Sequence, residues 1–157
     1  MAMEIGVIID GNFEECPDES WLRNVAEQVL LAQDVSSNVE LGIVITTQEK
    51  VQELNRSYRG QDKPTDVLAF SMTSATEETF VAPPDGVLHL GEVIISYPQA
   101  VIQAKEHKHS IKRELAILLI HGVLHLLDYD HEKPEQRKQM RAREKEIMNG
   151  IERGTAF

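Results

Sequence analysis

The sequence predicts an α+β fold in one domain, with a small mixed β-sheet of about four strands covered by helices. Three observations lead to this prediction. Short runs rich in Ile and Val alternate along the chain with longer stretches whose apolar residues recur at helical spacing. The length of 157 residues suits a single domain, residues 1–157, and no repeat or linker divides it. An apolar segment at residues 115–120 indicates a helix buried in the core.

The N-terminal half predicts two strands and two helices. Strands are expected at residues 4–10 and 39–46, where aliphatic residues alternate with others. Between these strands, apolar residues recur at helical spacing and predict a helix that begins near Asp18; they are Trp21, Leu22, Val25, Val29 and Leu30. Thr46 and Glu49 predict a capping box that starts a second, short helix.

The middle of the chain predicts two further strands, at residues 66–71 and 88–96, with a long polar loop at 72–86 between them. The second of these strands is almost entirely apolar, as expected for an interior strand. Gly91 within it predicts a bulge or a close approach of another backbone. Tyr97 and Pro98 then start a helix whose end, near His107 and His109, we interpret as solvated rather than metal-binding.

Two more helices follow. Ser110 is a suitable N-cap for the buried central helix. Pro134 suits the first turn of the last helix, whose alternating charges predict a solvated face that includes Glu144. A thin apolar stripe is left for packing; it consists of Met140, Ile147 and Met148. Residues 150–157 are expected to fray.

The central helix carries two histidines with metal-ligand spacing. His121 and His125 are four residues apart, so their side chains stack on one helix face about 6 Å apart at Cβ. His131 can fold back as a third ligand if the helix stops near Asp128, a residue type that tolerates a left-handed backbone. Three imidazoles leave a coordination position open, which is typical of catalytic sites. The same spacing occurs in the long zincin motif, so we predict a zincin-like metal helix in the core.

Glu114 precedes His121 by seven residues, about two helical turns. It can orient the metal site, act as a base, or pair with a nearby Lys or Arg, and the sequence leaves these alternatives open. Three imidazoles suit one divalent metal per chain, most often zinc, although nickel, copper and iron also accept such ligands.

The bulk composition is that of an ordinary globular chain, with 41% hydrophobic and 27% charged residues. The single cysteine, Cys16, excludes an internal disulfide and favours a reducing compartment. The N-terminus lacks the basic region of a signal peptide, and no apolar run is long enough to span a bilayer, so we expect a cytoplasmic protein without membrane contact. The net charge of −10 argues against nucleic-acid binding over the whole surface, and leaves only local basic clusters for it.

Residues 121–131 resemble the H-G-x-L-H-L-x-G-Y-D-H signature of the YbeY family of metal-dependent bacterial endoribonucleases. The chain departs from this signature at Asp128, where the family has glycine. Residues 65–70 are similar to the family's T-D-V-L-S-F segment, with Ala69 in place of serine, and residues 90–95 resemble its L-G-D-I-x-I segment, with Glu92 in place of Asp.

The resemblance implies a single-strand-specific endoribonuclease that matures the 3′ end of 16S ribosomal RNA and acts in ribosome quality control. It also implies ribosomal RNA, the small ribosomal subunit and its assembly factors as partners. Arg59 is then the residue that binds the phosphate and stabilises charge on it, with Glu114 as the other catalytic candidate.

Two alternatives remain. A zincin-like metalloprotease shares the histidine spacing, but it needs a glutamate directly after the first histidine, where this chain has Gly122. A non-enzymatic ribosome-assembly factor would use the metal for structure only, with Asp128 or Asp130 as a fourth ligand.

Overall fold

The computed structural model describes residues 3–35, 38–61, 65–72, 87–127 and 133–154. In these ranges the chain forms one four-stranded sheet and five helices. The elements in chain order are β1 (Met3–Ile9), α1 (Glu19–Ala32), β2 (Val39–Thr46), α2 (Gln48–Arg59), β3 (Val67–Ser71), β4 (Leu88–Ser96), α3 (Tyr97–Glu106), α4 (Ile111–Leu126) and α5 (Pro134–Gly154). The predicted α+β architecture is confirmed.

The sheet is mixed, with the strand order β1-β2-β4-β3. β1, β2 and β4 run parallel, and β3 pairs antiparallel with the far side of β4. β4 therefore lies inside the sheet, as its continuous apolar sequence predicts.

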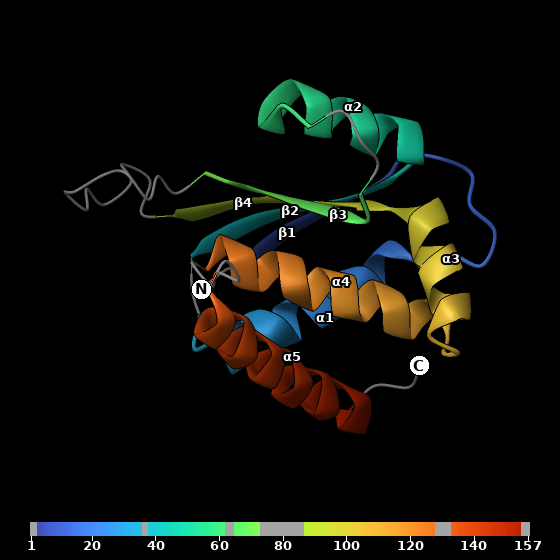
Figure 1. Cartoon of the computed structure of the whole chain (residues 1–157). Helices are drawn as coiled ribbons and strands as arrows, with labels where there is room; N and C mark the ends of the chain where they lie inside the picture. Colours follow the sequence, from blue (N-terminus) through green and yellow to red (C-terminus); the bar gives the residue numbers. More distant parts are fainter. Residues whose placement is uncertain (1–2, 36–37, 62–64, 73–86, 128–132, 155–157) are drawn as a thin grey trace.

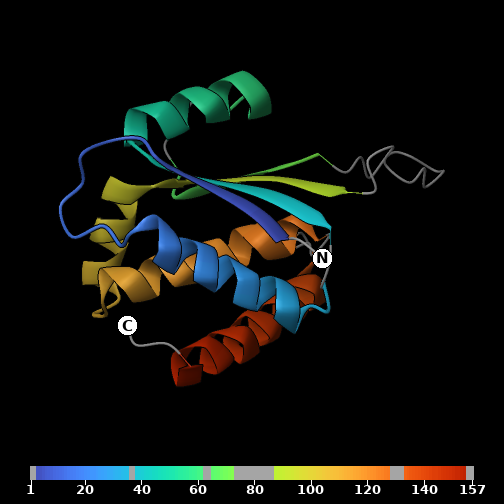
Figure 2. The same ribbon diagram turned by 180° about the vertical axis from the view of Figure 1, so that it is seen from behind.

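Helices cover both faces of the sheet (Figure 1). α2 lies alone over one face, while α1 and α4 lie side by side over the other and α5 packs outside them (Figure 2). Alternate residues of β4 divide between two cores. Val93 and Ile95 face the large core beneath α1 and α4, whereas Ile94 packs with Val51 of α2 in a small second core. Every helix in the described ranges is too short or too polar to cross a membrane.

Gly91 confirms the close approach predicted for it. Its φ is +131°, and a Cβ built there would lie 2.0 Å from the carbonyl oxygen of Phe70 on β3. The pairing of β2 with β4 shifts between Glu40 and Leu41, which marks a bulge opposite this glycine. A side chain at residue 91 would break the contact between β3 and β4.

Two sequence-based boundaries are wrong. The N-cap of α2 is Thr47, whose side chain accepts a hydrogen bond from the Lys50 amide at 3.3 Å. Thr46 is still in β2, where its buried hydroxyl donates to Asp10 at 3.2 Å. α5 also continues through residues 150–154 instead of fraying, because Ile151 is buried against the core.

Candidate metal centre

Helix α4 is the element that positions the candidate site. The Ser110 side chain caps it by accepting a hydrogen bond from the Arg113 amide at 3.1 Å. Ten of its sixteen residues are buried, because the helix packs against the sheet, α1 and α5. Between residues 114 and 126, its only polar side chains are Glu114, His121 and His125.

His121 and His125 lie together on a half-buried face of α4. Their ring centroids are 4.9 Å apart, with the planes at 71°. Nδ1 of His121 lies 2.7 Å from Oε1 of Glu144 on α5. Because an ionised carboxylate only accepts hydrogen bonds, Nδ1 is the donor in this contact, and a neutral His121 ring then carries its lone pair on Nε2. Two adjacent imidazoles, one held in a metal-binding tautomer, fit a divalent metal such as zinc.

Gly122 faces the sheet rather than the two imidazoles. A Cβ at this residue would lie 2.6 Å from Cγ1 of Val93 on β4. The residue after the first histidine is thus packed against the core, where the general-base glutamate of a zincin protease could not be accommodated. This packing disfavours the metalloprotease alternative.

The predicted third ligand, His131, lies outside the described residues, as do Asp128 and Asp130. Arg59 is exposed in the last turn of α2, directly before Gly60, which ends the helix in a left-handed conformation. Since α2 and α4 cover opposite faces of the sheet, the described residues do not bring Arg59 onto the face that carries His121 and His125 (Figure 1).

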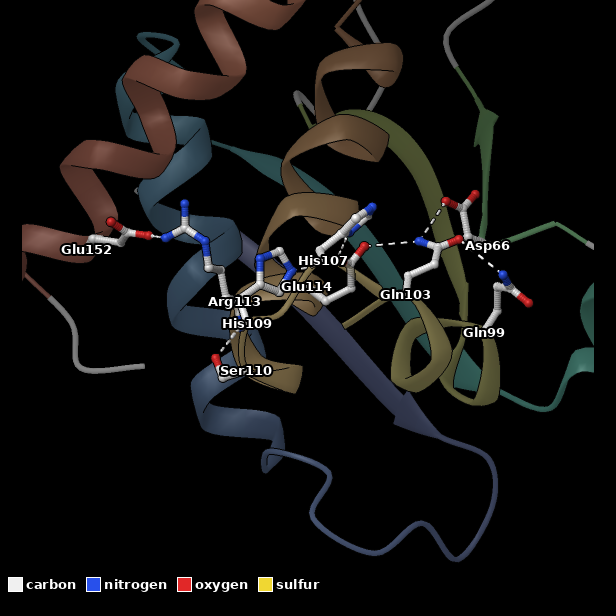
Figure 3. Close-up of polar contacts among 9 residues, drawn as sticks. All are labelled: Asp66, Gln99, Gln103, His107, His109, Ser110, Arg113, Glu114 and Glu152. Atoms are coloured by element: carbon white, nitrogen blue, oxygen red, sulfur yellow. Dashed lines mark hydrogen bonds and ion pairs between the residues drawn. The ribbon is translucent and has the colours of Figure 1, made fainter. Parts of the chain in front are cut away.

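Glu114 belongs to a separate cluster at the other end of α4 (Figure 3). Nδ1 of His107 and Nε2 of His109 lie 2.9 Å and 2.6 Å from its Oε1, and Gln103 donates to its Oε2 at 3.0 Å. Gln103 also donates to Asp66 at 3.3 Å. The end of α3 is therefore not simply solvated, because its two histidines bind a glutamate that is 1% exposed.

This cluster could hold a metal ion, since the ligand atoms of His107, His109 and Glu114 lie within 4.8 Å of one another. Two ligands of one tetrahedral zinc lie about 3.3 Å apart. Both histidine nitrogens are closer than that to the same carboxylate oxygen, so the contacts are those of hydrogen bonds. A bound ion would have to move these side chains apart.

The cluster shifts the pKa values of its members. Burial acts to raise the pKa of Glu114, but the hydrogen bonds from His107, His109 and Gln103 and the charge of His107 bring it below its ordinary 4.5. The hydrogen bond to Glu114 and the negative charge of that residue raise the pKa of His107 above its ordinary 6.5. The pair is therefore ionic at mildly acidic pH.

Glu144 is the contact residue that the sequence analysis missed, since it was assigned to a solvated face. The sequence carried a signal for this contact. Glu144 lies four residues after Met140 and four before Met148, so the three side chains share one face of the helix. The two methionines are buried and, with Ile147 and Ile151, form the stripe that α5 packs on the core. An acidic residue within an apolar stripe needs a buried partner.

The comparisons with known proteins agree with this architecture. A family model described as endoribonuclease YbeY matches residues 10–152. Two relatives carry the same name. One, from Dehalococcoides mccartyi, is 47% identical over 155 residues, which is 95% of this chain and 90% of the relative. The other, from Roseiflexus sp. (strain RS-1), is 45% identical over 85% of this chain and 84% of the relative.

A solved structure is similar as well. The solution structure of TM1509 from Thermotoga maritima superimposes with a TM-score of 0.61 at 26% sequence identity. The superposition covers 94% of this chain and 88% of that protein. The similarity therefore extends over nearly the whole fold.

Proposed function

The chain belongs to the endoribonuclease YbeY family, and we propose that its endoribonuclease activity cleaves single-stranded ribosomal RNA and depends on one divalent metal ion. The observation that carries this proposal is the pairing of His121 with His125 on a buried helix, in a chain that matches the family over residues 10–152. We propose the 3′ end of 16S ribosomal RNA as the substrate, within the small ribosomal subunit and its assembly factors. Such a substrate implies a cytoplasmic enzyme.

His121, His125 and His131 would hold the metal, with zinc as the most suitable ion for three imidazoles. When bound, such an ion supplies Lewis-acid activation of a water molecule or of a phosphate oxygen. The protein's own contribution is orientation. α4 holds two rings on one face, and Nδ1 of one of them lies 2.7 Å from Glu144 on α5.

Arg59 would bind a phosphate of the RNA. Its guanidinium is exposed and offers two parallel hydrogen bonds, which suit a phosphodiester of a bound RNA strand. Arg56 lies in the same last turn of α2, so this end of the helix is locally basic despite the net charge of −10. A protein with a negative net charge can bind RNA phosphates only through such local clusters of basic side chains.

A second basic surface lies beside the histidines, between α4 and α5. It is a cavity of about 250 Å³ whose lining consists of Arg113, Ile117, Ile120, Arg141, Glu144, Lys145, Met148 and Asn149. Arg113 is paired with Glu152, whereas Arg141 and Lys145 are exposed. Because Glu144 lines this cavity and also contacts His121, a phosphate bound there would lie close to the metal site.

We propose a positioning role for Glu114. Its buried carboxylate accepts hydrogen bonds from three side chains, and Gln103 links it to Asp66 at the start of β3. These contacts fix the corner between α3 and α4 and thereby the direction of the metal helix. A carboxylate with both oxygens engaged is poorly suited to taking a proton from the substrate.

The test is cleavage of an end-labelled, single-stranded ribosomal RNA fragment by zinc-loaded protein, with His121→Ala beside it. We expect cleavage by the wild type and none by the variant. His89→Ala is a matched control, since His89 lies on β4 and contacts Glu40. Equal cleavage by wild type and His121→Ala would contradict the proposal. Stoichiometric binding to the small subunit without cleavage would favour the assembly-factor alternative.

A further inference from the structure

Glu144 lies within the apolar stripe that α5 packs on the core. Met140 and Met148, four residues before and after it, are 1% and 5% exposed. The Glu144 side chain is itself only 22% exposed, although it carries a charge. A carboxylate in such surroundings is costly unless a donor compensates for the lost water. That donor is Nδ1 of His121, 2.7 Å from its Oε1.

The hydrogen bond has two consequences for the His121 ring. It restricts rotation of the imidazole, because the ring must keep Nδ1 directed at α5. It also stabilises the tautomer with the hydrogen on Nδ1, which puts the lone pair on Nε2. Histidines that bind metals commonly donate their other ring hydrogen to a carboxylate in this way, and losing the carboxylate weakens metal binding.

We propose that Glu144 is a positioning residue that holds the His121 ring in the orientation and tautomer required for metal binding. This inference rests on the proposed function, since it takes His121 as a ligand. Helix α5 would then belong to the metal centre through Glu144. This residue is 23 positions from His121 in the sequence. The packing of α5 against α4 would then set metal affinity as well as stability.

Glu146 provides a matched comparison on the same helix. It is two residues from Glu144 but points away from α4, with 68% of its side chain exposed. Its ion pair is with Arg143 at 2.9 Å, within α5 itself. Removing the charge of either glutamate changes the net charge equally, so the change in net charge cannot cause a difference between the two variants.

The experiment measures zinc affinity by competition with a chromogenic chelator. We expect Glu144→Ala to weaken zinc binding about 10–100-fold, while Glu146→Gln stays within about twofold of wild type. Glu144→Gln should fall between them, because its amide oxygen still accepts a hydrogen bond but carries no charge. Glu144→Gln also keeps the size of the side chain, and circular dichroism checks that each variant is folded.

A second measurement needs no metal. The ¹⁵N chemical shifts of the His121 ring in the metal-free protein should report hydrogen on Nδ1 in the wild type and a mixture of tautomers in Glu144→Ala. Unchanged zinc affinity in Glu144→Ala, or hydrogen on Nε2 in the wild type, would overturn the role of Glu144. Full zinc binding by His121→Ala would instead overturn the proposed metal site, so the two failures are distinguishable.

Discussion

At the scale of single residues, the polar side chains of α4 are explained by their partners. Between residues 114 and 126, Glu114 and His121 are two of the three polar side chains of α4, and each contacts a group of complementary chemistry from outside the helix. Glu114 accepts hydrogen bonds from two imidazoles, those of His107 and His109. His121 contacts the carboxylate of Glu144. Because an unpaired buried polar group is costly, these contacts favour the same rotation of α4 as its apolar packing does.

Arg59→Ala should retain zinc but lower RNA cleavage by about 10–100-fold, the loss expected for one charge-assisted contact to a phosphate. The guanidinium would hold a phosphate of the RNA on the α2 side of the sheet, without touching the proposed metal ligands on α4. Single-turnover cleavage and zinc content are measured on the same preparation. Arg56→Ala is the control from the same helical turn, and an equal loss in both variants would mean that Arg59 contributes only general charge.

Glu114→Gln should lower the free energy of unfolding by about 1–3 kcal/mol near pH 6, because His107, His109 and Gln103 lose their buried, ionised acceptor. The pKa of Glu114 is lowered, so its contribution is present above 4.5 and is lost as the pH falls below that value. The pKa of His107 is raised, so its contribution is complete below 6.5 and is lost as the pH rises through its higher folded value.

The difference in stability between wild type and Glu114→Gln should therefore be greatest between about pH 4.5 and 6.5. Denaturant unfolding at pH 5.5 and pH 8.5 measures it. A difference that is equal at both pH values would show that the ion pair with His107 contributes nothing.

At the scale of elements, the distance between α4 and the sheet depends on Gly122. A methyl group there would overlap the Val93 side chain, whose branched Cβ leaves it little freedom to move. α4 approaches β4 closely at Gly122, which lies between His121 and His125 in the sequence of the helix. The glycine that excludes a protease-type glutamate thus also sets the distance between α4 and the sheet.

Gly122→Ala should destabilise the fold by about 1–3 kcal/mol despite the better helix propensity of alanine. Val93→Ala removes the obstructing methyl groups, so the double variant should be more stable than the sum of the single effects predicts. Gly150→Ala on α5 is the control. A Cβ at residue 150 meets no atom within 4 Å, so this change should be neutral or stabilising. Purely additive effects would contradict the close approach.

At the scale of the whole molecule, α4 is the central element of the layered arrangement. It contacts the sheet, α1, α3 and α5, so a ligand bound to it is coupled to most of the core. A metal held by residues of α4 and by His131 would join this element to the segment that follows it. Metal binding should consequently raise the stability of the entire domain rather than of a local loop.

Zinc at about 100 times its dissociation constant should stabilise the protein by about 2.7 kcal/mol, or roughly 5–10 °C in melting temperature. His125→Ala should show no such shift at the same concentration. Differential scanning fluorimetry with and without a chelator measures both. A full shift in His125→Ala would move the metal to another site, for which the cluster of His107, His109 and Glu114 is the candidate.

The sequence by itself determined the features that depend on neighbouring residues. The periods of its apolar residues, together with prolines and capping residues, predicted the helices and strands that the described ranges contain, and Gly91 marked the close approach in β4. The spacing of His121 and His125 placed two imidazoles on one face, because a helix fixes the relation between residues four apart. Errors at this level were small, such as the N-cap one residue early at Thr46 instead of Thr47.

Only the tertiary structure decided which distant groups meet. Strand order, the antiparallel placement of β3 and the partners of Glu114 and Glu144 all depend on packing between elements. Charge alternation in α5 predicted a solvated face that includes Glu144. In the structure Met140 and Met148 pack on the core, and Glu144 between them therefore lies between α4 and α5. The physical reason is that local periodicity specifies which face of an element is apolar, whereas the partner of a polar group on that face is chosen by the arrangement of the whole chain.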